Sequence, residues 1–343
     1  QYLASYKKTF ADLHNFDVLA GYESYNLKLQ ELQGSNTKIY NPTIGELNNA
    51  IASPPRVASF TNEYTTMGYL ARIQYDYDEK YFVSASYRRD ASSRFHPDNR
   101  WGNFGSVGLA WLINKENFMS NVSWIDMLKF KASYGIQGND NLGNYYAYAD
   151  QYSVTNSNGD FAVSFSYKGN KDITWETSYA FNTGFDFELF GNRLNGTVEY
   201  FNRKTVDLLY NQPVPISMGY ATIPMNVGSI VNQGIEVDLN GVLYKNNNIE
   251  WLANINATHY KNKITDLAES AKRNGGIKYS NAIYRIGGSL YNSYMPVYAG
   301  VDPNDGQALY YVDPDNGDYT TTNDYSKAKQ SDLGSTLAKV YGG

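Results

Sequence analysis

The 343-residue sequence has no cysteine and only three histidines, and these absences remove several kinds of site. Without cysteine there is no disulfide scaffold, no cysteine-ligated zinc and no cysteine nucleophile. The histidines His14, His96 and His259 are far apart, and none has a ligand partner at the spacing of a zinc site. With no cysteine and only scattered histidines, the sequence offers few residues that could form a catalytic triad. We therefore expect no enzyme, no catalytic residue, no metal site and no cofactor.

Strong positive charge and long apolar runs are missing as well. The net charge of −5 gives no basic field for nucleic acid. No stretch of about 18 apolar residues exists, so the sequence predicts no transmembrane helix. Aromatic residues are abundant instead, with 33 Tyr, 15 Phe and 5 Trp. Tyrosine suits membrane–water boundaries because its ring is apolar and its tip polar, but this composition alone fits a tyrosine-rich soluble β protein equally well.

The dominant hydrophobic period is two, which is typical of β-strands with two different faces. In 231–244, Val231, Ile235, Val237, Leu239 and Leu243 share one face, and Asn232, Glu236, Asp238 and Asn240 share the other. After the polar turn 245–248, a second run alternates Trp251 and Ile255 with Asn254 and Asn256. Two such runs across a short turn predict a β-hairpin. Further hairpins are expected around Asp12, Asp78 and 190–193.

Strand length and loop length favour a membrane barrel over a soluble sheet. The runs extend over roughly 10–14 residues, and a tilted strand needs about 9–11 to cross a bilayer. Tight turns alternate with the long polar segments 29–63, 138–174, 206–230 and 263–283, as in barrels with short periplasmic turns and long outer loops. We count about eleven strands, with a twelfth beginning near Leu337, and this count places the long acidic segment 301–336 on the periplasmic side, where the turns are. The fold class is therefore all-β, an antiparallel transmembrane β-barrel with 11–12 strands of a larger one. The ends look cut rather than finished.

Two acidic stretches resemble calcium loops but depart from the required spacing. In 313–318 the glycine is at the fifth position rather than the sixth, and the closing glutamate is missing. The segment 302–306 is similar. Asp, Pro, Asn and Gly are also the residues that turns require, and we favour turns.

An ordered series of short motifs resembles the SusC/RagA type of TonB-dependent outer-membrane transporter. It begins with 87–95 (YRRDASSRF) and continues through 99–102, 110–111 and 116–119. Later members are 128–135 (LKFKASYG), 138–139, 174–177, 185–186, 200–205 (YFNRKT), 208–209, 226–228, 232–236 (NQGIE) and 298–302. Each piece is weak alone, but their order covers nearly all of 60–343.

The resemblance implies a 22-stranded barrel that holds a plug domain in its interior. It also implies a SusD-like surface lipoprotein as a lid, and energy supplied by TonB-ExbB-ExbD through an N-terminal segment that this chain lacks. The implied cargo is an oligosaccharide or a peptide, and the implied location is the outer membrane of a Bacteroidota-like Gram-negative bacterium, in contact with its lipid. Residues 1–343 would then be a partial barrel domain without the plug and the terminal strands.

Alternation and loop composition assign candidate residues within such a barrel. Ile235, Val237, Leu239, Trp251 and Ile255 should face lipid, and Asn232, Glu236, Asp238, Asn254 and Asn256 should face the lumen. Candidate cargo contacts lie in two outer loops, because aromatic faces stack on sugars and amides bind hydroxyls: Tyr145, Tyr146, Tyr148, Tyr152, Tyr210, Asn211, Gln212 and Tyr220. These tyrosines could instead mark the lipid headgroup boundary. The motif 88–95 is expected to organise the rim.

Two other functions share parts of this pattern. A passive porin would have the same periodicity without a plug or a lid, and a soluble carbohydrate-binding β protein would have shorter strands. A barrel enzyme would need a nucleophile and a base, which the sequence does not offer.

Overall fold

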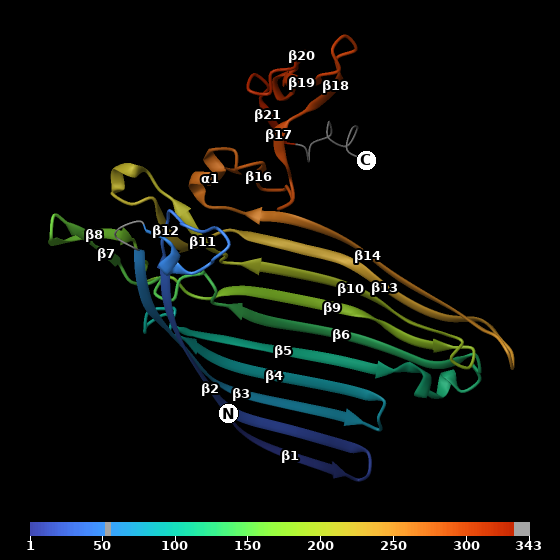
Figure 1. The fold of residues 1–343 in the computed structure, drawn as a ribbon. Helices are drawn as coiled ribbons and strands as arrows, with labels where there is room; N and C mark the ends of the chain where they lie inside the picture. The colour runs from blue at the N-terminus through green and yellow to red at the C-terminus, as the bar shows by residue number, and fades with distance from the viewer. Residues whose placement is uncertain (52–55, 333–343) are drawn as a thin grey trace.

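The computed structural model describes residues 1–51 and 56–332, and its main feature is one large antiparallel sheet (Figure 1). Ten strands form it, in the order β1-β2-β3-β4-β5-β6-β9-β10-β13-β14. Their bounds are β1 Tyr2–Phe10, β2 His14–Ser35, β3 Arg56–Tyr77, β4 Tyr81–Ser92, β5 Trp101–Leu112, β6 Ile125–Asn139, β9 Glu176–Leu189, β10 Leu194–Val206, β13 Ser229–Lys245 and β14 Glu250–Asp266. Sequential strands are neighbours in space throughout, which is the meander topology of an up-and-down barrel.

Tight turns join the strands at one end of the sheet, which we call the turn end. Asp78 and Glu79 have φ values of 54° and 45°, and Phe190 and Asn192 have φ values of 60° and 57°. Left-handed residues of this kind match the twist of a two-stranded hairpin. These hairpins, the one at Asp12 and the β13–β14 hairpin after Lys245 confirm the predicted turns.

The opposite end of the sheet, the loop end, carries the long connections and the smaller elements. These are β7 Gln151–Ser157, β8 Asp160–Tyr167, β11 Leu209–Pro213, β12 Thr222–Asn226, α1 Glu269–Arg273, and the 3-10 helices Leu47–Asn49 and Ile216–Met218. Two further 3-10 helices, Ile113–Lys115 and Asn117–Met119, lie in the longer connection at the turn end. The sheet itself is a single layer, so the small apolar core of Phe95, Ala147 and Ile173 lies in the loops. In the described ranges, no helix is long and apolar enough to span a membrane.

The predicted eleventh strand of the large sheet does not form. Residues 277–332 make only short elements: β15 Ile277–Tyr279, β16 Ala282–Tyr284, β17 Tyr294–Pro296, β18 Tyr298–Val301, β19 Ala308–Asp313, the 3-10 helix Pro314–Asn316, β20 Asp318–Thr322 and β21 Gln330–Asp332. Glycine and proline recur too often here for a long strand, and Gly287, Gly300 and Gly306 adopt positive φ. The twelfth strand expected near Leu337 lies outside the described residues.

This difference also moves the acidic segment 301–332 to the other end of the sheet. The strand count places it at the turn end, but the chain leaves β14 at the loop end and stays there (Figure 1). Backbone hydrogen bonds of 2.8 Å between Ile264 and residues Gly287 and Gly288 hold the chain that leads into this segment against the end of β14. The segment is therefore part of the loop region.

Candidate functional site

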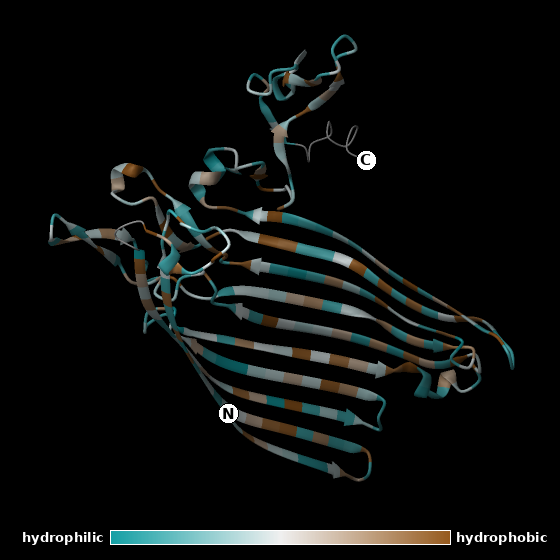
Figure 2. Ribbon diagram, viewed as in Figure 1, coloured by the Kyte–Doolittle hydropathy of each residue, from teal (hydrophilic) through white to brown (hydrophobic). Residues whose placement is uncertain are grey.

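The strand register gives the large sheet two chemically different faces. Asp238 pairs with Asn256, and Glu236 pairs with Glu199 of β10, so these side chains share one face. Val237 pairs with Val198 and Ala257 on the opposite side. We call these the polar face and the apolar face. Figure 2 shows the resulting alternation of hydrophilic and hydrophobic residues along the strands.

Ion pairs connect several strands across the polar face. Lys131 of β6 lies 2.9 Å from Asp186 of β9 and 2.9 Å from Glu199 of β10. Near the other edge, Lys7 lies 2.8 Å from Asp17. Paired charges of this kind remain in contact with water, so the polar face fits the water-filled interior of a barrel and not a lipid contact.

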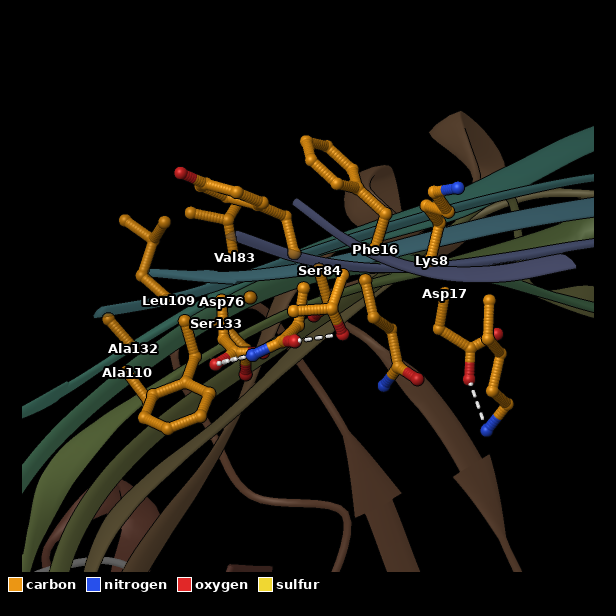
Figure 3. Close-up of a pocket in the computed structure, with 17 residues that line it drawn as sticks. Lys8, Phe16, Asp17, Asp76, Val83, Ser84, Leu109, Ala110, Ala132 and Ser133 are labelled. Atoms are coloured by element: carbon orange, nitrogen blue, oxygen red, sulfur yellow. Dashed lines mark hydrogen bonds and ion pairs between the residues drawn. The ribbon is translucent and has the colours of Figure 1, made fainter. Parts of the chain in front are cut away.

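The first strands show the same division between the two faces at close range (Figure 3). Phe16, Val83 and Leu109 project from one side of the sheet, while Asp17 and Asp76 project from the other, toward which the later strands curve. Asn15 donates a hydrogen bond of 3.0 Å to Asp76. The residues drawn come from both faces, so they border the sheet without enclosing a single cavity.

The register brings all five predicted lumen residues onto the polar face. Asn254 pairs with Asn240, and Asn232 accepts a hydrogen bond of 2.6 Å from Asn262. The predicted lipid residues Ile235, Leu239 and Ile255 lie on the apolar face. A bulge between Val242 and Tyr244 places Tyr244 opposite Trp251, so Tyr244, and not only the predicted Leu243, ends this face.

Aromatic rings mark the turn end of the apolar face. Tyr77 stacks on Tyr81 with centroids 6.4 Å apart, and Tyr81 stacks on Trp111 at 6.3 Å. Trp124 stacks on Phe190 at 5.6 Å, and Trp251, 64% exposed, continues the row on β14. Exposed aromatic rings in a row across neighbouring strands are typical of the girdle at a membrane–water boundary.

A second aromatic row crosses β2, β3 and β5 farther toward the loop end. Tyr22 contacts Tyr69 at 5.3 Å, and Tyr69 stacks on Trp101 at 6.4 Å. Tyr69 and Tyr77 belong to the same strand, and the eight residue steps from one to the other correspond to about 26 Å along it. On a strand tilted by about 35–45°, that length spans about 20 Å across the membrane, close to the apolar band of about 25 Å in outer-membrane barrels.

The motif 88–95 ties the loop end of the sheet together, as predicted for a rim. Arg88 lies 2.7 Å from Asp90 and 3.0 Å from Glu23 of β2. Arg94 pairs with Asp140, which also accepts hydrogen bonds from Tyr64 and Ser92 at 2.8 and 2.6 Å. Phe95 is fully buried against Trp175, 5.5 Å away. Strands β2 to β4 and the 140–148 loop are thereby joined.

Three of the candidate cargo tyrosines pack into this rim instead of facing outward. The Arg94 guanidinium lies over the Tyr145 ring, 5.2 Å from the centroid of that ring. The Tyr146 hydroxyl accepts the backbone N–H of Glu63 at 3.1 Å. Tyr148 packs on the core that contains Phe95. Each therefore has a structural contact that accounts for its position.

Tyr152 and Tyr220 instead belong to an open aromatic cluster outside the rim. Phe165 of β8 lies 5.7 Å from Tyr152 and 6.2 Å from Tyr220, and so joins the two predicted loops. On the same hairpin face Val154 pairs with Val163, and Phe161 is 90% exposed. Phe165 and Phe161 were not among the sequence candidates. The signal was an Asn158-Gly159 turn between alternating apolar residues, which favours a two-residue hairpin.

The base of this hairpin is closed by a charged clasp. Asp150 accepts hydrogen bonds from Lys168 at 3.0 Å and from the backbone N–H of Gly169 at 2.9 Å. The Lys168 hydrogen bond, and then the backbone bond, lower the pKa of the Asp150 carboxyl. The pKa of Lys168 is raised for the same reason. The clasp joins the two ends of the β7–β8 hairpin.

The remaining candidates lie on β11. Burial raises the pKa of the Tyr210 hydroxyl, which is half-buried, and Asn211 is exposed. Gln212 donates a hydrogen bond of 3.2 Å to Ser270, while its buried Oε1 has no partner within the described residues. These three residues lie on the β11–β12 hairpin, whose loop carries Tyr220, but within the described residues no side-chain contact joins them to the open cluster.

The two acidic stretches form turns. Asp302 accepts the backbone N–H of Asn304 at 2.8 Å, and Asp313 accepts a hydrogen bond of 2.9 Å from Asn316. The Lys329 ammonium, bound to Asp313, lowers the pKa of this carboxyl. No group of three metal-ligating side chains occurs in 1–51 and 56–332.

Residues 2–337 match the model of the TonB dependent receptor-like β-barrel. The chain therefore belongs to the TonB-dependent receptor β-barrel family, which are outer-membrane transporters of Gram-negative bacteria and not enzymes.

Two curated relatives and one solved structure are similar over most of the chain. TonB-dependent receptor P39 of Formosa agariphila is 34% identical over 301 residues, which are 84% of this chain and 28% of the relative. TonB-dependent receptor SusC of Bacteroides thetaiotaomicron is 30% identical over 74% of this chain and 26% of its own length. The structure of the RagAB peptide transporter matches 96% of this chain and 36% of its own, with 28% identity and a TM-score of 0.82. The chain thus spans about a third or less of the proteins it resembles.

Proposed function

We propose that this chain is part of the barrel wall of a SusC/RagA-type importer that takes up oligosaccharides or peptides with energy supplied through TonB. The carrying observation is the two-faced sheet, with paired charge on one side and an apolar band between aromatic rows on the other. This arrangement fits a wall between water and lipid. The match with the transporter family is the reason for proposing TonB-dependent import through this wall.

The proposed partners follow from the same similarity. A SusD-like surface lipoprotein would close over the loop end, and TonB-ExbB-ExbD would act through a plug and an N-terminal segment outside residues 1–343. The similar solved structure is described as a peptide transporter, which supports peptide cargo. The similarity to SusC supports a SusC-type importer, and we therefore keep both cargo classes. A Bacteroidota-like source is proposed because proteins of Formosa agariphila and Bacteroides thetaiotaomicron align over most of the chain.

In the loops above the wall, Tyr152 and Tyr220 are the best-placed candidate cargo contacts. They lie at the loop end with Phe165 between them, and Tyr152 is 62% exposed. Exposed rings can stack on a sugar face or on an apolar peptide side chain. Tyr145, Tyr146 and Tyr148 are weaker candidates because their rings already pack in the rim.

The test is uptake of labelled oligosaccharides and of short peptides by cells that produce the complete protein, with and without TonB. The proposal expects uptake that stops when TonB is deleted, and a surface lipoprotein that co-purifies in mild detergent in near-equal amount. Uptake that continues without TonB, together with a barrel that purifies alone, would instead establish the passive porin.

A further inference from the structure

Three lysines lie close together on the apolar face of β10 and β14. Lys204 pairs with Val231 of β13, and Val231 pairs with Lys263, so the two lysines lie on either side of one valine. Lys261 lies two residues before Lys263 on the same face. Strands about 4.8 Å apart place the outer two Cα atoms roughly 10 Å from one another. All three side chains are exposed.

Amide groups extend the same surface. Asn202, in the row next to Lys204, donates a hydrogen bond of 3.2 Å to Gln233. Gln233 in turn pairs with Lys261. Figure 2 shows the hydrophilic colour along the loop-end stretches of β10 and β14. We call Lys204, Lys261, Lys263, Asn202 and Gln233 the lysine patch.

The positive charge of the lysine patch has no internal counter-ion. In the part of the chain that the structure describes, none of the three lysines has an ion-pair partner. The neighbouring carboxylate on this face, Asp266, is engaged by Lys272 at 2.8 Å. Three uncompensated like charges on a sheet repel one another, so an anion bound from outside would stabilise the arrangement.

The lysine patch lies where the lipid contact should end. Strand β14 begins at Glu250, and the roughly 9–11 residues needed to cross a bilayer therefore end near Lys261. On the turn-end side of the lysine patch, the same face carries Tyr200, Ile235, Val237 and Ile255. On β2 and β3 the corresponding boundary is aromatic, at Tyr22 and Tyr69. The lysines take the place of that aromatic row on this side of the sheet.

We propose that the lysine patch binds the phosphate of a phosphorylated lipid headgroup in the outer leaflet. Ammonium groups donate charge-assisted hydrogen bonds to phosphate oxygens, and Asn202 and Gln233 offer further donors. The acyl chains would then lie over Ile235 and Val237, directly below. Because a free phosphate ion has no such chains, the adjoining apolar surface favours a lipid. This proposal rests on the membrane placement of the sheet but not on the nature of the cargo.

The test is binding of diphosphorylated lipid A to the complete protein in phospholipid nanodiscs, compared with the same lipid after enzymatic removal of its phosphates. The variant Lys204→Gln/Lys261→Gln/Lys263→Gln removes the patch. A matched control, Lys8→Gln/Lys38→Gln/Lys171→Gln, removes the same charge from exposed lysines elsewhere that also have no ion-pair partner among the described residues. A lysine close to an anionic membrane surface contributes an energy that corresponds to about a fivefold change in affinity, so the patch variant should bind at least tenfold more weakly.

Each outcome decides the proposal. A large loss for the patch variant, none for the control, and weak binding of the dephosphorylated lipid would support it. Equal losses for both variants would mean bulk charge only, and equal binding of both lipids would mean that phosphate is not recognised; either result overturns it. Inorganic phosphate that binds to wild type with the affinity of the lipid would assign the patch to a free anion. Cargo uptake measured in parallel separates this failure from failure of the import function, since uptake should persist in the patch variant.

Discussion

The two faces of the large sheet are made by the same strands, yet they differ in nearly every physical property. Along β13, Glu236 and Asp238 lie on the polar face, while Val237 and Leu239 lie on the apolar face. Residues one position apart therefore meet different solvents. The environment of a side chain in this sheet is therefore set by whether its position along the strand is odd or even, more than by where it lies in the sequence.

The largest difference is expected between Val237→Lys and Asp238→Lys. A lysine on the lipid side near mid-bilayer costs about 2–4 kcal/mol, whereas one that faces a wet lumen costs much less. The measurement is the free energy of unfolding in lipid vesicles. Equal costs for the two variants, or the reverse order, would mean that the faces are assigned wrongly.

A smaller effect is expected from Lys131→Met on the polar face. Its loss leaves Asp186 and Glu199 without their shared cation, and a partly screened network of this kind contributes about 1 kcal/mol. Lys7→Met is the matched control, because the Lys7 side chain is 76% exposed and its pair with Asp17 is screened. Denaturant titration of both variants at low and high salt checks this: the Lys131 effect should be larger and should shrink with salt.

The loop tyrosines should separate stability from binding. Tyr152→Ala/Tyr220→Ala is expected to weaken cargo affinity by roughly two- to tenfold, which corresponds to the worth of one aromatic contact, with unchanged stability. Tyr146→Ala should do the opposite, since it removes the acceptor for the Glu63 N–H. Isothermal titration of the complete protein with its cargo, beside thermal unfolding, distinguishes the two. A loss of affinity confined to Tyr146→Ala would transfer the cargo site to the rim.

The smallest effect concerns pH. The lowered pKa of Asp150 means that its bond to Lys168 is fully formed above the carboxyl's ordinary value near 4 and is lost as the pH falls toward the lower, folded-state pKa. Amide exchange of β7 and β8 should therefore be constant from pH 7 to 5 after correction for intrinsic exchange rates, and protection should fall below pH 4. Asp150→Asn should remove this dependence. The same pH profile in the variant would show that another group titrates.

Sequence patterns predicted the wall of this protein better than its loops. Alternation placed Asn232, Asp238 and Asn256 on one face because a strand's period of two is enforced at every pair by the ladder. It could not place the bulge at Leu243, since an extra residue changes parity without changing composition. The prediction of an eleventh strand was wrong. The apolar residues in 284–300 resemble those of a strand, but Gly287, Gly288 and Pro296 prevent a long strand from forming there.

The candidate site was predicted only in part for a related reason. Tyrosines in a polar loop look alike in sequence, and only the fold separates Tyr146, whose hydroxyl bonds the Glu63 backbone, from Tyr152, which is exposed. Phe165 was missed although its Asn158-Gly159 hairpin was legible. Long-range contacts such as Arg94 with Asp140 depend on how the loops fold back, which no local pattern encodes.

The most direct test of the wall is a scan of single cysteines through residues 235–239, in a chain that contains no cysteine of its own. Each cysteine would be placed in the complete protein, reconstituted in lipid, and exposed either to a water-soluble maleimide or to a fluorophore followed by a lipid-attached quencher. Positions 236 and 238 should react with the maleimide, and positions 235, 237 and 239 should be quenched from the lipid. Uniform labelling, or the opposite alternation, would contradict the account of a barrel wall with its polar face inward.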